Sequence, residues 1–123
     1  MNLSKSEEEL MRHIWQMKEA FMKDLLEAYS EPKPKPSTVA TLLKRLRDKK
    51  AIDYKVYGSV RAYYPKISKE AYFAKRIRNM IRKFFNDSPA QFASFFTEQT
   101  ELSEEELSAL RDLIDQQIQS RQQ

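Results

Sequence analysis

The only glycine of the chain, Gly58, separates two short segments in which apolar and polar side chains alternate. Residues 52–57 and 60–64 have the two-residue period of β-strands, and Gly58-Ser59 fits a type II′ turn, whose first central residue takes a positive φ. Elsewhere apolar residues recur every three or four positions, which is the helical period. The pattern therefore predicts one two-stranded hairpin among helices. A single glycine also excludes the Gly-rich phosphate-binding loops of nucleotide-binding folds.

The first helical segment starts with a capping signal. Ser4 is followed three residues later by Glu7, the spacing of a capping box, and Ser6 with Glu9 offers an alternative frame. Apolar side chains at spacings of three and four predict that one stripe faces a core: Leu10, Met11, Ile14 and Trp15.

Prolines divide the second helical segment from the third. The second covers residues 23–29 and stops before residues 31–36, in which three alternate prolines forbid a helix. The third is expected to begin at Ser37, whose hydroxyl can cap it, and to end at Lys49. Its predicted buried stripe is Val39, Leu42, Leu43 and Leu46.

The order of three helices and a hairpin is that of a winged helix, a helix-turn-helix variant in which the hairpin flanks the DNA-reading helix. We expect a mainly α fold with a winged-helix DNA-binding domain over residues 1–66 and a helical dimerisation region over residues 67–123. In the second region two amphipathic helices, 68–86 and 103–119, flank a connector rich in phenylalanine. Pairing with a second copy would bury their apolar stripes in a two-fold homodimer, whereas packing back onto the winged helix is the alternative. The predicted interface residues are Phe73, Ile77, Met80, Ile81, Phe84, Leu107, Leu110 and Ile114.

Charge is distributed unevenly along the chain. Residues 32–86 carry 16 basic and 3 acidic side chains, while the segments on either side are net acidic. Such a concentration of positive charge favours a polyanionic partner such as double-stranded DNA, and the alternative is a merely solvated set of Lys and Arg.

Several functional classes lack the residues they require. The chain has no cysteine and one histidine, His13, so we expect no metal and no cofactor, and a structural role for His13. No nucleophile motif or glycine-built oxyanion turn is present, and we expect no enzyme. Because acidic residues stand where a signal peptide has its apolar core, and no apolar stretch is long enough to span a membrane, we expect a cytoplasmic protein.

The motifs of the first helix, the third helix and the hairpin resemble those of the penicillinase repressor family (BlaI/MecI/CopY type) of bacterial winged-helix repressors. The similar motifs are Leu3-Ser4-x-x-Glu7-x-x-Leu10-Met11-x-x-Ile14-Trp15, Ser37-Thr38-Val39-x-Thr41-Leu42-Leu43-x-Arg45-Leu46, Ile52-x-Tyr54 and Tyr63-Tyr64-Pro65, with a looser match at Leu102-Ser103-x-x-Glu106-x-x-x-Leu110. The resemblance implies a dimeric repressor that leaves its operator when a membrane sensor metalloprotease triggers its cleavage.

The chain also departs from that family. Lys50 stands where the family usually has a glycine after the recognition helix, so the turn there is expected to differ. The Cys-x-Cys motif of the copper-responsive branch is absent. In the β-lactam-responsive branch the cleaved bond lies between Asn and Phe, and the corresponding place here is Phe95-Phe96, the candidate cleavage site.

Candidate DNA contacts follow from the helical wheel of the third helix. The residues facing away from the apolar stripe, or at its margin, are small or basic, which lets a helix approach base edges: Ser37, Thr38, Thr41, Lys44 and Arg45. Exposed helix filler is the alternative for the threonines, and an ion pair with Asp48 or Glu27 is the alternative for Arg45. For the wing and the phosphate backbone the candidates are Lys33, Lys35, Lys49, Lys50, Lys55, Tyr57 and Arg61. A winged-helix protein-protein interaction module without DNA binding remains the alternative function.

Overall fold

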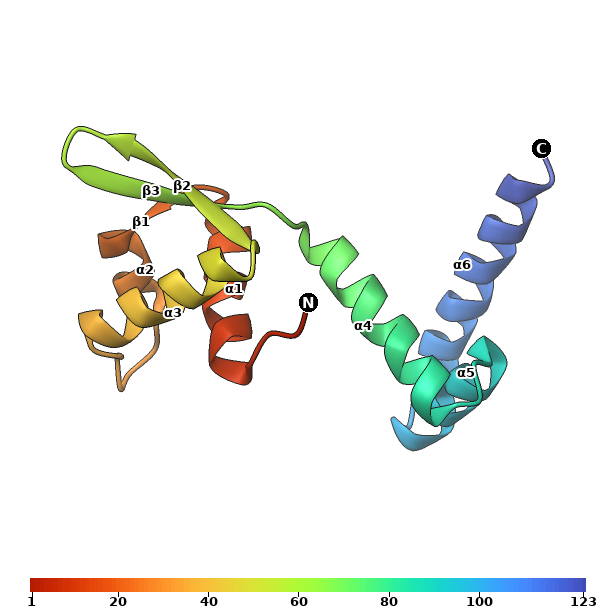
Figure 1. Cartoon of the computed structure of the whole chain (residues 1–123). Helices are drawn as coiled ribbons and strands as arrows, with labels where there is room; N and C mark the ends of the chain where they lie inside the picture. The colour runs from red at the N-terminus through yellow and green to blue at the C-terminus, as the bar shows by residue number, and fades with distance from the viewer. The chain divides into compact units, whose positions relative to one another are not determined.

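The computed structural model describes all residues, 1–123, and divides into two compact units, Met1–Ala74 and Lys75–Gln123. The chain forms six helices and a small sheet, a mainly helical fold as predicted (Figure 1). In chain order the elements are α1 (Lys5–Met17), β1 (Ala20–Phe21), α2 (Met22–Ala28), α3 (Pro36–Asp48), β2 (Ile52–Tyr57), β3 (Val60–Pro65), α4 (Lys69–Phe84), α5 (Pro89–Gln99) and α6 (Glu104–Arg121).

The first unit extends beyond residue 66, the predicted end of the winged helix. Tyr72 is buried, and its ring lies 5.8 Å from that of Trp15 on α1, while the Phe73 ring lies 6.0 Å from Trp15. The Trp15 indole N–H also donates to the Ile67 carbonyl at 2.8 Å. The first turns of α4 therefore pack on α1.

The capping box of α1 uses the Ser4 and Glu7 frame. The Glu7 amide donates to Ser4 Oγ at 3.2 Å, and the Ser4 amide donates to Glu7 Oε1 at 2.7 Å. This reciprocal pair satisfies two N–H groups that a helix start leaves unpaired. The frame of Ser6 and Glu9 is not the one used, because the helix already begins at Lys5.

The start of α3 differs from the sequence prediction. Ser37 is not the cap: Lys35 occupies the N-cap position and Pro36 is the first helical residue. Proline suits that position because its fixed φ is helical and it has no N–H to leave unpaired. Ser37 lies one residue inside the helix, where its carbonyl accepts a hydrogen bond from Thr41 Oγ1 at 3.0 Å.

The turn after α3 keeps the left-handed geometry, contrary to the expectation from Lys50. Lys50 has φ 65° despite carrying a side chain. Its amide donates to the Arg47 carbonyl at 2.9 Å, and the Ala51 amide donates to the Leu46 carbonyl at 2.9 Å. These bonds satisfy carbonyls at the helix end, and this offsets the cost of a left-handed lysine.

The sheet has three antiparallel strands in the order β1-β3-β2, one more than predicted. The hairpin of β2 and β3 is the predicted one, with Tyr57 opposite Val60 at the turn. Gly58 has φ +63° and Ser59 is not in the positive-φ region, as a type II′ turn requires. The added strand β1 has two residues, which pair with Tyr63 and Ala62 of β3.

One hydrophobic core holds the first unit together. It contains the predicted stripes of α1 and α3, of which Leu10, Met11, Ile14, Val39, Leu42, Leu43 and Leu46 are buried. Trp15 is partly buried at its edge. Leu25 of α2 and Ile52 of β2 complete the centre, so α2, α3 and the hairpin are fixed around α1.

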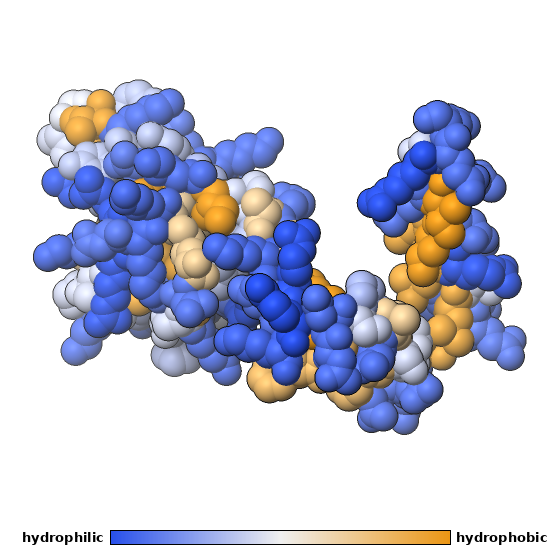
Figure 2. Space-filling view, turned by 45° about the vertical axis from the view of Figure 1, so that its right-hand side comes forward, coloured by the Kyte–Doolittle hydropathy of each residue, from blue (hydrophilic) through white to orange (hydrophobic).

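The second unit has helices but no buried side chain. None of the residues 75–123 is buried, although α4, α5 and α6 present many apolar groups. The predicted connector is itself a helix, α5, capped by Ser88, whose Oγ accepts from the Gln91 amide at 3.1 Å. Phe85 contacts Phe92 and Phe95 of α5, with ring centroids 5.5 Å and 5.2 Å apart. Figure 2 shows the apolar band that remains open along α6.

None of the six helices combines the length and the hydrophobicity that crossing a membrane requires.

Candidate nucleic-acid interface

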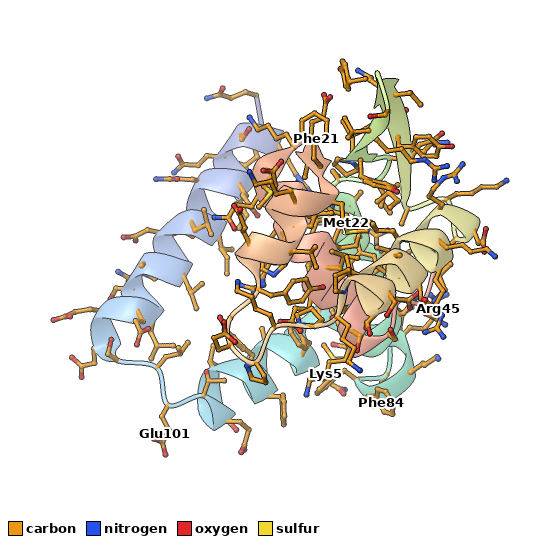
Figure 3. All side chains as sticks on the ribbon, turned by 90° about the vertical axis from the view of Figure 1, so that its left-hand side faces the viewer. Lys5, Phe21, Met22, Arg45, Phe84 and Glu101 are labelled. Carbon is orange, nitrogen blue, oxygen red and sulfur yellow. The ribbon has the colours of Figure 1, made fainter.

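The face of α3 opposite the core is exposed, small and polar. All five predicted reading residues are exposed: Ser37, Thr38, Thr41, Lys44 and Arg45. Thr41 uses its hydroxyl proton within the helix, so its oxygen is left to accept, not donate, a further hydrogen bond. No carboxylate lies within ion-pair distance of Arg45, so neither Asp48 nor Glu27 neutralises it. Figure 3 shows Arg45 at the surface of α3.

Lys33 does not present a free ammonium group. Its Nζ donates to the carbonyls of Leu26, Glu27 and Tyr29, at 3.3, 3.1 and 2.8 Å. These carbonyls lie at the end of α2, which has no basic residue of its own in its last turn. Lys33 therefore caps α2 and complements the negative end of its dipole, rather than reaching outward as the sequence suggested.

Lys49 is likewise held within the first unit. Its Nζ donates to Glu7 Oε1 at 2.7 Å and to the Asn2 carbonyl at 2.9 Å. Burial favours a raised pKa for the Glu7 carboxyl, but the hydrogen bonds from Lys49 and Ser4 prevail and lower that pKa. The bond ties the segment after α3 to the start of α1, and the ammonium group of Lys49, whose side chain is 39% exposed, is shared with Glu7.

The remaining predicted basic residues are exposed. Lys35 precedes α3, Lys50 follows it, and Lys55 lies on β2 with its Nζ 5.5 Å from the centroid of the Tyr64 ring. Arg61 on β3 places its guanidinium carbon 4.3 Å from the centroid of the Tyr54 ring. Lys55 pairs with Ala62 and Arg61 pairs with Val56, so these two side chains lie on opposite faces of the hairpin, and Arg61 shares the face of Tyr54.

Arg47 is a basic residue that the sequence prediction missed. It lies three positions after Lys44, so the two side chains are neighbours on the helix. Its guanidinium carbon also lies 4.3 Å from the Tyr54 centroid, and its Nε lies 3.6 Å from Asp53 Oδ1. The spacing from Lys44 was the signal available in the sequence.

The tip of the wing is apolar rather than basic. Val56 is 64% exposed and Val60 is 50% exposed, on either side of the turn. The predicted contact Tyr57 is also exposed, and its ring meets that of Phe21 edge-on at 6.1 Å. A hydrogen bond to Glu19 and the negative charge of that residue raise the pKa of Tyr57. The tip therefore offers apolar and hydroxyl contacts, and the cations lie further along the strands.

The metal-ligating side chains are dispersed, and the single histidine is buried. No group of three His, Cys, Asp or Glu side chains gathers where it could hold an ion. His13 is buried, its ring meets that of Tyr29 edge-on at 4.9 Å, and its Nε2 has no hydrogen-bond partner. Burial and the nearby Arg12 charge lower the pKa of His13, which keeps the ring neutral. This is the environment of a core histidine.

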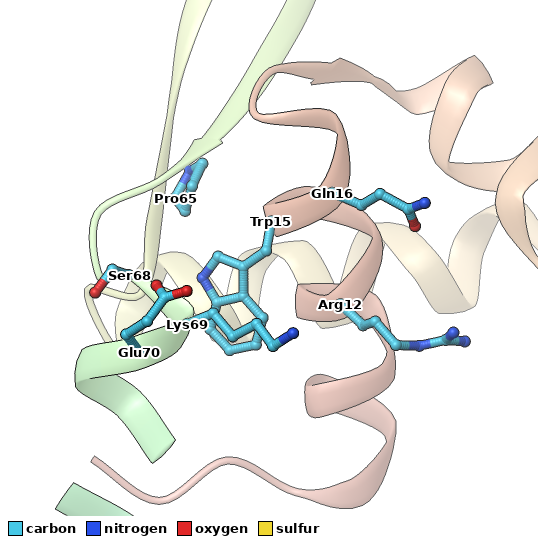
Figure 4. A pocket seen from close by; sticks show the side chains of 7 residues that line it. All are labelled: Arg12, Trp15, Gln16, Pro65, Ser68, Lys69 and Glu70. Atoms are coloured by element: carbon cyan, nitrogen blue, oxygen red, sulfur yellow. The ribbon is translucent and has the colours of Figure 1, made fainter. Parts of the chain in front are cut away.

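An open pocket of about 480 Å³ lies beside Trp15, between α1 and the start of α4 (Figure 4). Acidic and basic side chains share its rim, and the Trp15 ring forms part of its wall. The lining residues are Arg12, Trp15, Gln16, Pro65, Ser68, Lys69 and Glu70. Because these charges are of mixed sign and exposed, the pocket favours no particular ligand.

The predicted dimer residues divide between the two units. Phe73 packs against Trp15 in the first unit, so it already has a partner within the chain. Ile77, Met80, Phe84, Leu107 and Ile114 expose large parts of their side chains, while Ile81 and Leu110 are partly exposed. Leu110 and Ile114 line an apolar groove of about 390 Å³ between α5 and α6.

Three helices around one core, with an antiparallel sheet that ends in a protruding hairpin, define a winged-helix protein. The more specific assignment comes from sequence. Residues 3–116 match the family described as penicillinase repressor, and the chain belongs to this family.

Individual relatives agree with that assignment. The chain is 29% identical over 113 residues to the methicillin resistance regulatory protein MecI of Staphylococcus aureus (strain N315), covering 91% of this chain and 92% of MecI. It is 26% identical over 115 residues to the penicillinase repressor of Bacillus licheniformis, covering 93% and 90%. The solution structure of the DNA binding domain of the repressor BlaI is similar with a TM-score of 0.52 and 29% identity, covering 58% of this chain and 88% of that domain.

Proposed function

We propose that this chain is a dimeric, sequence-specific DNA-binding transcriptional repressor that acts in the cytoplasm. The observation that carries the proposal is the exposed face of α3, where small polar residues are followed by Lys44 and Arg45 with no carboxylate beside Arg45. The relatives are named as repressors or regulators, and the similar solved domain is named as DNA-binding. The proposed role is regulatory and involves no catalysis.

In this proposal α3 enters the major groove and the hairpin lies along the neighbouring backbone. Thr38 and Thr41 offer methyl groups to thymine and oxygen atoms to base amino groups, and Arg45 can donate two hydrogen bonds to guanine. Lys35, Lys44, Lys50 and Lys55 supply charge toward phosphates without reading sequence. We leave Lys33 and Lys49 out of this proposed surface, because carbonyls and a carboxylate within the chain already accept their hydrogen bonds.

The second unit is proposed to join two copies. Its helices bury no side chain, so they gain little stability from each other within one chain. A second copy would cover the open faces of α4 and α6 and supply the missing core, and it would hold two readers for the two halves of an operator.

Release from DNA is proposed to follow cleavage, triggered by a membrane sensor metalloprotease, at or near the Phe95-Phe96 bond. That bond lies within α5, so a protease reaches it in extended form only after the helix opens locally. Three hydrogen bonds from Thr97 and Thr100 side chains run to carbonyls within α5, and such bonds weaken a helix slightly. Mass spectrometry of the chain from induced cells tests this step, and an intact chain with a vacated operator would contradict it.

DNA binding is tested by selecting a duplex from a random library with the full chain and measuring its affinity by fluorescence anisotropy. With about 6 to 10 phosphates neutralised by a dimer, the logarithm of affinity is expected to fall with the logarithm of salt at a slope of about −5 to −9. Arg45→Ala is expected to cost about 1 to 3 kcal/mol on the selected duplex and less on random DNA. Lys23→Met, an exposed cation on α2, is the matched control. Absence of any enriched duplex would favour a protein-protein interaction module instead.

A further inference from the structure

Tyr54 brings together two cations from different elements. Its ring is partly buried against the core, and the guanidinium carbons of Arg47 and Arg61 each lie 4.3 Å from its centroid. Arg47 belongs to α3 and Arg61 to β3, so the ring of β2 joins the helix to the wing. The two guanidinium carbons are therefore at most twice that distance apart.

The strand register explains why Arg61 reaches the ring. Tyr54 stands directly opposite Tyr63, and Arg61 is two residues before Tyr63 on the same strand. Alternation along β3 places Arg61 on the same face of the sheet as Tyr54, at the diagonal position that long side chains span. Tyr54 packs against the core, which fixes the position of its ring. The ring in turn fixes where the Arg61 guanidinium group lies.

The geometry of Arg47 is fixed by a second contact. Asp53 Oδ1 accepts a hydrogen bond from the Tyr54 amide at 2.8 Å and lies 3.6 Å from Arg47 Nε. Because Asp53 lies beside Nε, the terminal N–H groups of Arg47 stay available for another acceptor. No carboxylate lies within ion-pair distance of Arg61.

Two cations and one carboxylate leave this cluster with a net positive charge. Like charges held on one ring repel each other, and an anion bound between them would relieve that repulsion. Arginine stacked on an aromatic ring keeps its planar fork rigid, and that fork matches the two oxygens of a phosphate.

We propose that Tyr54 is a positioning residue that holds Arg47 and Arg61 as a clamp on neighbouring phosphates of one DNA strand. This rests on the proposed DNA-binding function. If α3 lies in the major groove and the wing lies over the adjacent minor groove, the sugar-phosphate strand between the grooves passes where helix and wing meet. At the Tyr54 cluster exposed side chains of α3 and of the hairpin meet, and the cluster carries the charge that this strand requires.

The test compares two substitutions of Tyr54 in the full chain. Tyr54→Phe keeps the ring that the guanidinium groups contact, and Tyr54→Leu removes it. On the selected duplex Tyr54→Leu is expected to weaken binding by about threefold to tenfold, and Tyr54→Phe by less than about twofold. Urea unfolding followed by Trp15 fluorescence checks that both variants are folded under the binding conditions.

A second measurement separates the clamp from a purely structural role. Single phosphates of the selected duplex are replaced in turn by uncharged methylphosphonate. The native chain is expected to lose affinity at one or two neighbouring positions, and Tyr54→Leu to lose much less at those same positions. Arg47→Met and Arg61→Met are each expected to reduce the salt slope by about 1.8, because a dimer loses one phosphate contact in each copy.

The outcomes distinguish the two proposals. If the native chain binds no duplex, the proposed function itself fails. If the native chain binds, but Tyr54→Leu keeps the native affinity and methylphosphonate profile, the clamp is wrong. If Arg47→Met or Arg61→Met alters base preference at an unchanged salt slope, these arginines contact bases, and the phosphate assignment is overturned.

Discussion

Lys49→Met is expected to destabilise the first unit and to leave DNA binding almost unchanged. The substitution removes the ammonium group that bonds Glu7 Oε1 at 2.7 Å, and it keeps most of the length of the side chain. The Glu7 side chain is only 2% exposed and its Oε2 has no partner, so the carboxylate would lose its cation in a site that water hardly reaches.

The expected loss follows from that geometry. Breaking a buried ion pair costs about 3 to 5 kcal/mol, but the Lys49 side chain is 39% exposed and water can replace part of it, which points to about 2 kcal/mol. Glu7→Gln removes the charge and keeps an oxygen for the Ser4 amide, so it is expected to cost about 1 kcal/mol. In the Glu7→Gln background Lys49→Met should add less than about 0.5 kcal/mol, because the charge to be paired is gone.

Urea unfolding followed by the fluorescence of Trp15, the only tryptophan, measures these free energies for the first unit. The pKa of Glu7 is lowered in the folded state, so its contribution is present above the unfolded pKa and is lost as pH falls through the folded pKa. Acidification should thus destabilise the native chain more than Glu7→Gln. Additive effects of the two substitutions, or a reduced salt slope of DNA binding in Lys49→Met, would refute the reasoning.

Three further perturbations test other contacts. Lys33→Met should cost about 1 kcal/mol of stability by uncapping α2, with the DNA salt slope unchanged; a smaller slope at native stability would restore Lys33 as a phosphate contact. Ile114→Asp places a charge on the open face of α6, where Ile114 is 53% exposed, and should shift sedimentation from dimer to monomer at micromolar concentration, whereas Arg121→Asp should not. Burial lowers the pKa of His13 below 6.5, so the unfolding free energy should decrease as pH falls below that value; a variant His13→Gln with the same decrease would rule His13 out as its source.

The periodic parts of the fold were predictable because they depend on local spacing. The stripes of α1 and α3 and the turn at Gly58 follow from intervals of three, four and two residues. β1 was not predictable from its own residues, because Ala20 and Phe21 become a strand only by pairing with β3, about forty positions later.

The sequence predicted which residues of the candidate interface are exposed, but not which of its lysines are bonded to other groups of the chain. Exposure of Thr41 and Arg45 follows from the helical wheel, and the structure agrees. Whether a lysine is available depends on acceptors brought close by folding: Lys49 meets Glu7, which is 42 positions away in the sequence. Lys33 meets the end of α2 only because the proline segment turns back toward it.

Because the chain has a single glycine, several residues with side chains adopt backbone conformations that glycine would adopt with less strain. Five residues other than glycine have positive φ, namely Lys18, Lys50, Asn86, Asp87 and Glu101. At such positions a side chain adds steric strain of about 1 to 2 kcal/mol, less for Asn and Asp, and glycine would relieve it at some entropic cost. For protein engineering, a single replacement such as Lys18→Gly is therefore expected to raise the free energy of unfolding, and it changes neither the core nor the exposed face of α3.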